Sequence, residues 1–263
     1  MNVWRTTARR WSKYRVERLL PLALVLLFLL AWQLGVAVGL LEPLFFPAPT
    51  TIAAALLESC RTGELFTHLT ATLLRVVQGV VLGCVPAALL GLVMGWSPRA
   101  RVVLDPLVAA GHPMPKIAIL PLLMVILGIG ELSKVVAVAI AAFFPMLLSS
   151  MAAVRQISPQ LFDVARCYGA SRRQTLTRIV VPASLPLMLT GLRLSINVAL
   201  MVTIAVELIA SRTGLGTLIW LAWETMRTEE LYAGIIVIAI LGVTFSLVLK
   251  HAEKVLIPWQ QER

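Results

Sequence analysis

Charged residues are scarce in this chain. Only 14% of its 263 residues are Asp, Glu, Lys or Arg, whereas 59% are hydrophobic. Soluble domains carry about 25% charged residues, and their helices are apolar on one face only. Here the apolar runs are continuous on every face, and the mean hydropathy is +0.89. These features exclude an ordinary soluble protein and indicate a chain that crosses a membrane several times.

Cysteine and histidine are also few, and the motifs of several enzyme classes are missing. The three cysteines form no C-x-x-C pair, and the three histidines form no H-E-x-x-H motif. Neither a disulfide framework nor a metal site is therefore expected. No Gly-Lys dipeptide occurs, so the sequence lacks the phosphate-binding loop of nucleotide-binding proteins. We expect no cofactor and no catalytic site in this chain.

Six apolar runs are long enough to cross a bilayer as helices, which takes about 20 residues. They cover approximately residues 19–41, 69–96, 104–130, 134–154, 185–210 and 232–250. Basic residues precede the first run, as they do in a signal peptide. That run is nevertheless longer than the roughly 7 to 15 apolar residues of a cleaved segment, and it leads into Glu42 and Pro43. We therefore predict a retained helix.

The third run is the least regular of the six. It contains Asp105, Lys116 and the four prolines Pro106, Pro113, Pro115 and Pro121. Proline inside a helix removes a backbone hydrogen bond, and lipid offers no replacement partner. We therefore predict that this helix is kinked or broken and that it packs against other helices or lines a cavity.

The distribution of Lys and Arg predicts the orientation. A formal charge of +10 could indicate a nucleic-acid partner, but most basic residues lie between the apolar runs. With a cytoplasmic N-terminus, the inner segments hold 16 of the 23 Lys and Arg residues and the outer segments hold four. Basic loops stay in the cytoplasm, where anionic lipid attracts them. We predict that segment 1–18 and tail 251–263 are cytoplasmic and that the basic charge meets membrane lipid, with no nucleic acid involved.

Small residues recur at the spacing of helix contacts. The pairs are Gly35-x-x-x-Gly39, Gly79-x-x-x-Gly83 and Gly91-x-x-x-Gly95. Glycine lets two helix backbones approach closely in a membrane, so each pair is a candidate contact.

The segment between the fourth and fifth runs, residues 155–184, carries the clearest helix signals, and we call it the elbow. Ser158 can cap a helix that begins at Pro159. Gly169 can supply the left-handed residue that ends this helix. The first half of the elbow is therefore predicted to be a short helix closed by a glycine turn.

A second elbow helix is predicted after the glycine. Ser171 and Gln174 have the spacing of a capping box, and Pro182 is expected to end the helix where the chain re-enters the membrane. The arginines left outside are Arg166, Arg172, Arg173 and Arg178. A basic helix after a turn can also be a DNA-recognition helix, but the flanking apolar runs argue against that interpretation. We predict a rigid docking surface.

The elbow resembles the cytoplasmic EAA loop of binding-protein-dependent ABC permeases. That loop reads Glu-Ala-Ala, three residues, Gly, nine residues, Ile, one residue, Leu-Pro, and this chain keeps the spacing without a gap. It departs from the pattern at Asp163 for Glu, Val164 for Ala and Val181 for Leu. The resemblance implies coupling to an ATPase through Asp163, Ala165, Gly169, Ala170, Ser171, Arg172, Ile179 and Pro182.

Further blocks resemble the nitrate, sulfonate and taurine type of permease. They are FPAPTTI from residue 46, HPMPKIAILPLLMVILGIGELSK from 112, GLR from 191, AVELIA from 205, SRTGLGTLI from 211 and KVLIPW from 254. The resemblance implies an all-α polytopic protein of the bacterial inner membrane with six transmembrane helices. The elbow would be a helix-turn-helix coupling loop between helices four and five, within a permease domain that covers residues 66–250.

The same resemblance implies the partners and the solute. The chain would pair with a second copy of itself, bind two cytoplasmic ATP-binding-cassette ATPase subunits, and receive solute from a periplasmic binding protein. The solute would be a small oxyanion such as a sulfonate, taurine or nitrate, and the ATPase subunits would bind the ATP. The alternatives are a permease for another small solute such as a pyrimidine precursor, an integral-membrane enzyme, or a non-transporting scaffold.

Polar residues inside the predicted spans are candidates for the solute path. Lys116, Asn197 and Glu207 are the main ones. Because charge inside a membrane is costly, Lys116 and Glu207 are expected to face the bundle interior, where they either pair with other side chains or line the path. Arg75 and Arg193 lie nearer the span ends and are expected to reach the lipid headgroups.

Overall fold

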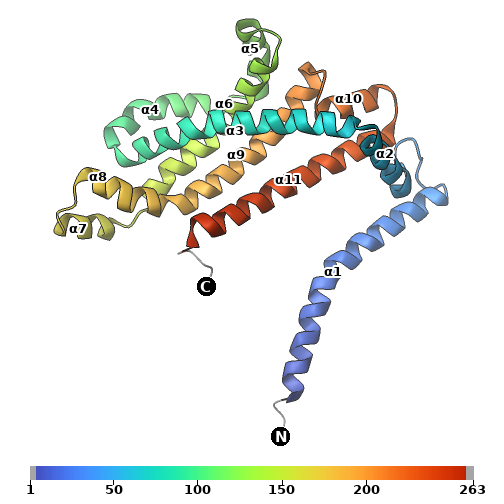
Figure 1. Cartoon of the computed structure of the whole chain (residues 1–263), viewed down its shortest axis with the longest axis horizontal. Coiled ribbons are helices and arrows are strands. Elements are labelled where there is room, and N and C mark those ends of the chain that lie inside the picture. Colours follow the sequence, from blue (N-terminus) through green and yellow to red (C-terminus); the bar gives the residue numbers. More distant parts are fainter. Residues whose placement is uncertain (1–3, 259–263) are drawn as a thin grey trace.

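The computed structural model describes the backbone of residues 4–258 and the side chains of residues 20–258. Over this part of the chain every regular element is a helix (Figure 1), which confirms the predicted all-α fold. The basic side chains of the predicted cytoplasmic segment 1–18 lie outside the described residues. Residues 259–263, the end of the predicted tail, lie outside them too.

In the described part of the chain, five helices are long and apolar enough to cross a membrane. They are α1 (Trp4–Ala37, with its apolar part from Leu20), α3 (Glu64–Trp96), α6 (Glu131–Arg155), α9 (Val181–Ala210) and α11 (Thr228–Leu256). Each coincides with a predicted run, although the helices extend beyond several of the runs. Length matters here because a helix rises only about 1.5 Å per residue.

The third predicted span is a bent pair of helices. α4 (Pro98–Gly111) meets η1 (Lys116–Ile119) and α5 (Leu120–Leu127) at an angle of 88°. The break contains Pro113 and Pro115, which have no N–H group to continue a helix. The predicted break in this span is therefore confirmed.

Packing of α6 between α3 and α9 forms the centre of the bundle. The pairs Gly79–Gly83 and Gly91–Gly95 of α3 lie directly against α6. A Cβ atom at Gly83 would stand 2.2 Å from the carbonyl oxygen of Ala139, so no larger residue fits there without moving a backbone. Two of the three predicted glycine pairs therefore mark real helix contacts. The third pair does not, because Gly39 lies beyond the end of α1 with nothing within 4 Å of its Cβ position.

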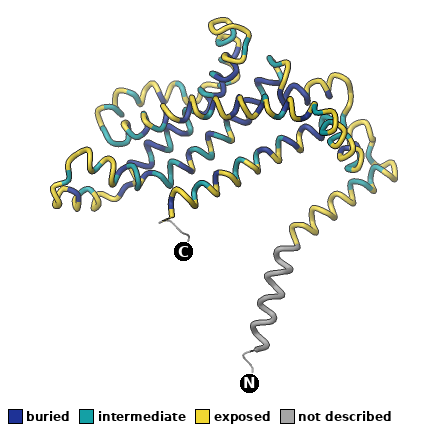
Figure 2. Tube along the Cα trace, viewed as in Figure 1, coloured by how far each residue is buried: buried dark blue, intermediate teal, exposed yellow. Residues whose placement is uncertain are grey.

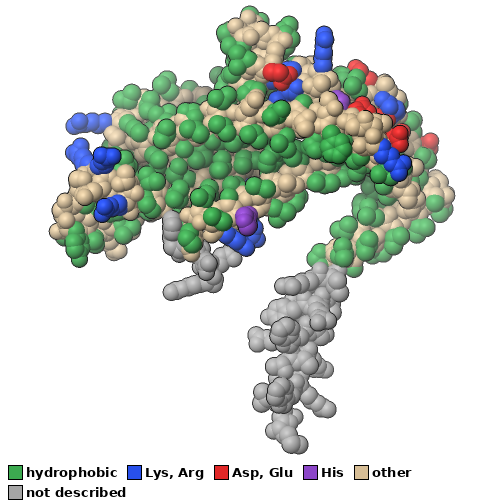
Figure 3. Space-filling view, in the orientation of Figure 1, with side chains coloured by type: hydrophobic (Ala, Val, Ile, Leu, Met, Phe, Trp, Pro, Cys, Tyr) green, Lys and Arg blue, Asp and Glu red, His purple; other side chains and the backbone are tan. Residues whose placement is uncertain are grey.

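Helix α1 stands apart from the bundle and approaches it only at one end (Figure 1). There the ring of Trp32 lies 5.7 Å from the ring of Tyr232 on α11. In the stretch Leu20–Ala37, 0% of the residues are buried, and Figure 2 shows most of this stretch exposed. Apolar side chains also cover the visible flank of the bundle in Figure 3. A surface of this kind is suited to lipid or to another protein.

Short helices close the two ends of the bundle. α2 (Pro49–Thr62) and α10 (Leu215–Glu224), which the sequence analysis does not predict, both pack on α11 at one end. The elbow lies at the opposite end (Figure 1) and contains α7 (Pro159–Cys167), α8 (Arg172–Thr175) and the π-helix η2 (Leu176–Val180). The candidate coupling residues are therefore at one end of the molecule.

Candidate coupling elbow and intramembrane polar sites

The first half of the elbow has the predicted backbone. Ser158 occupies the N-cap position of α7, and Pro159 is its first residue. Gly169 has φ +66°, which confirms the predicted left-handed turn. The amide of Ala170 donates to the carbonyl oxygen of Ala165 at 2.9 Å, which closes the helix end. One detail is wrong: the hydroxyl of Ser158 makes no capping bond to the backbone.

The second half confirms the capping box and corrects the role of Pro182. The amide of Gln174 donates to Ser171 Oγ at 3.3 Å, and the amide of Ser171 donates to Gln174 Oε1 at 2.8 Å. Pro182 does not end this helix, because the chain runs on through η2 into α9. In η2 the amide of Val181 donates to the carbonyl oxygen of Leu176, five residues back. This wider π turn lets the helix pass a residue that has no N–H group.

Apolar contacts anchor the elbow to the inner part of the bundle. The ring of Phe162 lies 5.9 Å from the ring of Trp96 at the end of α3. Val180 is fully buried and packs with Val154 at the end of α6. Ala165 is also buried. Packed side chains therefore connect the elbow to the ends of α3 and α6.

The outer face of the elbow is basic and partly apolar. Its four arginines are exposed, as predicted, and Tyr168 is 87% exposed. Asp163 forms a surface ion pair with Arg166, a type of pair that contributes little to stability. Of the remaining predicted coupling residues, Ser171 and Arg172 are exposed, and Ala170 and Ile179 are half-buried.

Arg75 lies at the centre of a group that we call the polar cluster: the buried residues Thr72, Arg75, Lys134 and Glu207, and the exposed residue Glu131. Arg75 Nη1 donates to Glu207 Oε1 at 2.7 Å, and its Nε and Nη2 donate to Glu131 at 2.6 and 2.9 Å. The expectation that Arg75 reaches the headgroups is wrong. Arg75 is only 3% exposed, and it is bound by buried Glu207 on one side and by exposed Glu131 on the other.

Glu207 connects the polar cluster to the start of α10. It accepts from the Thr72 hydroxyl and from the amide of Gly216, each at 2.9 Å. The Thr72 hydroxyl in turn accepts from the amide of Leu215 at 2.8 Å. Glu207 is 1% exposed, so the prediction that it faces the bundle interior and is paired is confirmed. The cluster joins α3, α6, α9 and α10 near the end opposite the elbow.

Lys116 and Asn197, the other predicted path residues, lie elsewhere. Lys116 Nζ donates to the carbonyl oxygens of Gly111, His112 and Met114 at 2.6–2.8 Å and lies 4.5 Å from the centroid of the Phe144 ring. It therefore closes the break between α4 and η1. Asn197 is exposed on α9. Within residues 20–258 no hydrogen bond or ion pair joins Lys116, Asn197 and Glu207.

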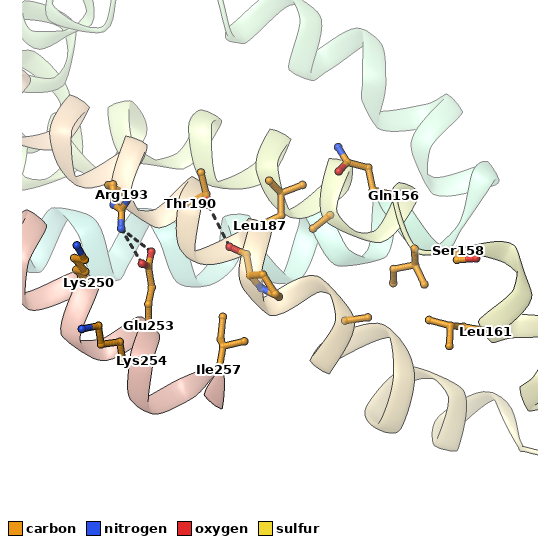
Figure 4. Close-up of a pocket in the computed structure, with 14 residues that line it drawn as sticks. Gln156, Ser158, Leu161, Leu187, Thr190, Arg193, Lys250, Glu253, Lys254 and Ile257 are labelled. Atoms are coloured by element: carbon orange, nitrogen blue, oxygen red, sulfur yellow. Dashed lines mark hydrogen bonds and ion pairs between the residues drawn. The ribbon is translucent and has the colours of Figure 1, made fainter. Parts of the chain in front are cut away.

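Arg193 also has a partner inside the protein. Its Nη2 donates to both carboxylate oxygens of Glu253 on α11 at 2.8 Å. The expectation that Arg193 reaches lipid alone is therefore wrong. The pair lies at the edge of a cavity of about 1250 Å³ between α9, the end of α11 and the elbow (Figure 4). Sequence reasoning missed both this cavity and the acidic partners of the two arginines.

A comparison with known protein families identifies the family of this chain. The model of the family "binding-protein-dependent transport system inner membrane component" matches residues 79–261. The chain belongs to this family. The matched region contains the elbow and most of the bundle, from within α3 through α11.

Named relatives and a solved structure agree with this membership. The chain is 34% identical over 258 residues to the taurine transport system permease protein TauC of Escherichia coli (strain K12), covering 96% of this chain and 94% of TauC. It is 31% identical over 229 residues to the putative aliphatic sulfonates transport permease protein SsuC of Bacillus subtilis (strain 168), covering 87% and 83%. A chain of the inward-facing MetNI methionine ABC transporter shares the fold with TM-score 0.60 and 17% identity, covering 74% of this chain and 95% of that chain.

The chain is thus the membrane-spanning permease subunit of an ABC importer in the inner membrane, and it is not itself an enzyme. A permease of this family works with ATPase subunits and with a solute-binding protein. The elbow and the polar cluster are therefore parts of an ABC importer subunit.

Proposed function

We propose that this permease imports a small sulfonate, with taurine as the first candidate. The observation that carries the proposal is the 34% identity to a taurine permease over 96% of this chain. The 31% identity to an aliphatic sulfonate permease supports the same chemical class. The binding protein that delivers the solute contributes to selectivity, so the proposal concerns the complete importer.

The functional unit in this proposal contains two copies of the chain, two ATPase subunits and a periplasmic binding protein. One chain supplies one set of spans and one elbow, and two ATPase subunits need two elbows. None of the residues in the apolar stretch Leu20–Ala37 of α1 is buried, which supports a contact with a second protein as well as with lipid.

The elbow and both termini face the cytoplasm in this proposal, and α2 and α10 face the periplasm. The excess of Lys and Arg in the inner segments, 16 against four, supports this orientation. In the view of Figure 3, the charged side chains visible on the elbow end are Lys and Arg, whereas the opposite end shows Asp and Glu as well.

Coupling runs through the elbow. ATP binding draws the two ATPase subunits together, the docked elbows move with them, and the paired bundles change between inward-open and outward-open states. The contacts of Phe162 with Trp96 and of Val180 with Val154 support this route. They link the elbow to the ends of α3 and α6.

Uptake by whole cells tests the solute. Cells that lack their own sulfonate importers receive this chain together with its ATPase and binding-protein partners, and uptake of labelled taurine is measured. We expect uptake that an excess of unlabelled taurine or an alkanesulfonate abolishes and that nitrate or a pyrimidine precursor leaves unchanged. Competition by the pyrimidine precursor alone would contradict the sulfonate proposal.

A further inference from the structure

The cavity beside Arg193 lies at the end of the most apolar span. α11 has the most apolar sequence of the five spanning helices in the described part of the chain, and it ends at Leu256. Lys250, Glu253 and Lys254 occupy its last two turns and line the cavity. Arg193 on α9 also lines the cavity, and its side chain points toward Glu253, as Figure 4 shows. The cavity therefore opens where the membrane core gives way to the polar headgroup layer.

The cavity carries a net positive charge. Its charged lining residues are Arg193, Lys250, Lys254 and Glu253. Arg193 and Glu253 neutralise each other at 2.8 Å. Lys250 and Lys254 are exposed, and neither forms an ion pair with any residue from 20 to 258. Two ammonium groups, with three N–H donors each, are thus available to an anion.

An apolar stripe leads along α11 to these two lysines. Val243 and Leu247 are 59% and 62% exposed. Together with Lys250 and Lys254 they follow one another along α11 at steps of four, three and four residues. Residues at this spacing share one face of a helix. The face is therefore apolar along the membrane core and basic at its inner end. The cavity wall adds apolar groups from Pro186, Leu187 and Ile257.

We propose that this cavity binds the headgroup of an anionic phospholipid from the cytoplasmic leaflet. The ammonium groups of Lys250 and Lys254 donate charge-assisted hydrogen bonds to the phosphate oxygens, and the acyl chains lie along Val243 and Leu247. Basic pockets between helices on the cytoplasmic side have the chemistry that such lipids require. The site is separate from the polar cluster, and it takes a structural lipid, not the transported solute.

Two other occupants fit the observations less well. A free soluble anion gains nothing from the apolar stripe that ends at Lys250. An ATPase subunit docks on the exposed face of the elbow, around Tyr168, whereas the lysines lie on the membrane-spanning helix α11. The combination of apolar and basic surface on one helix face favours a lipid.

Native mass spectrometry of the purified full-length chain tests the proposal. The protein is titrated with phosphatidylglycerol or phosphatidylcholine, and the variant Lys250→Gln/Lys254→Gln is compared with Arg99→Gln/Arg101→Gln. The control pair is also basic and lies at the start of α4, outside the cavity lining. We expect the cavity variant to bind phosphatidylglycerol about tenfold more weakly than the unaltered chain. The control variant and the binding of phosphatidylcholine should not change.

Further variants and a competition with inorganic phosphate distinguish lipid binding from the alternatives. Lys250→Arg/Lys254→Arg keeps both charges and should retain phosphatidylglycerol. If the double Gln variant does not accumulate, the single variants Lys250→Gln and Lys254→Gln should each bind about threefold more weakly. The proposal is overturned if the Gln variants bind phosphatidylglycerol normally. It is also overturned if inorganic phosphate displaces the lipid at equal concentration. None of these measurements depends on transport, so a negative result leaves the sulfonate proposal standing.

Discussion

Arg75 and Glu207 carry opposite charges and are both buried. Each neutralises the other, which allows both to lie inside a membrane-spanning bundle. Their side chains are 4% and 0% exposed, and they lie 2.7 Å apart. An unpaired charge in such a place is costly, whereas a pair with further hydrogen bonds is tolerated. Glu131, whose side chain is 61% exposed, binds the other edge of the guanidinium group. Glu131 can be hydrated without Arg75, whereas the buried guanidinium group of Arg75 depends on the carboxylates to balance its charge.

A double-mutant cycle tests this dependence. Glu207→Met leaves Arg75 with only one of its two carboxylate partners, and we expect it to reduce stability by about 3–5 kcal/mol. The double variant Arg75→Met/Glu207→Met removes both buried charges. Its loss of stability should therefore be clearly smaller than the sum of the losses in Arg75→Met and Glu207→Met. The measurement is thermal unfolding of the purified chain followed by tryptophan fluorescence. Additive losses from the two single variants would contradict the pairing.

Sequence reasoning predicts the burial of Glu207 but not the partners of the arginines. The cost of charge in lipid is enough to place Glu207 inside. It does not reveal that Arg75 lies beside a carboxylate 132 positions away, or Arg193 beside one 60 positions away. Opposite charges inside two predicted spans were the available signal. Choosing among possible pairs requires the helix packing, which a single sequence does not contain.

At the scale of elements, proline and glycine give the most reliable local predictions. The prolines of the third span predict its 88° break, and Gly169 predicts the left-handed turn of the elbow. Pro182 is the exception, because the π turn of η2 changes the local hydrogen bonding. The helices α2 and α10 were missed because each is shorter than a span and lies between two predicted runs. Pro49 at the start of α2 and left-handed Gly63 at its end were usable signals.

Gly169 offers a test of the elbow that separates folding from coupling. No atom lies within 4 Å of a Cβ built at this glycine, so a substitution acts through the backbone alone. Gly169→Val at φ +66° should cost on the order of 1–2 kcal/mol locally and misplace α8. We expect normal amounts of the variant in the membrane but loss of the ATPase subunit, or of its solute-stimulated hydrolysis. The measurement is ATPase co-purification from solubilised membranes.

Asp163→Glu is the matched change for the same assay. Asp163 pairs with Arg166 on the surface of α7, and the longer carboxylate can keep that pair. We expect it to co-purify the ATPase as the unaltered chain does. Normal coupling by Gly169→Val would remove the main reason for assigning coupling to the elbow.

At the scale of the whole molecule, the orientation has a direct test in the native cysteines. Cys60 lies near the end of α2 and is half-buried, Cys167 is exposed at the end of α7, and Cys84 is buried. Variants that keep one cysteine each are treated with a membrane-impermeant thiol reagent. In intact spheroplasts we expect labelling of Cys60 only, and after permeabilisation labelling of Cys167 as well. Labelling of Cys167 but not of Cys60 in intact spheroplasts would show that the chain has the opposite orientation.

The charge distribution and the apolar runs together predict the architecture, whereas they leave the assembly open. The continuous apolar surface of α1 needs a covering, and lipid and a second copy both satisfy that need. The elbow resembles a docking loop, and two ATPase subunits need two such loops. A dimer of this chain is therefore the expected assembly. The dimer and its partners have to be tested together, because transport belongs to the complex.

ATP-dependent taurine uptake by proteoliposomes is the most direct test of the central claim. The reconstituted complex contains two copies of this chain, two ATPase subunits and the binding protein, with ATP supplied on the side of the elbow. Accumulation of taurine only when ATP and the binding protein are both present is the predicted result. Accumulation without ATP, or none under any condition from a complex that hydrolyses ATP and binds taurine, would contradict the account.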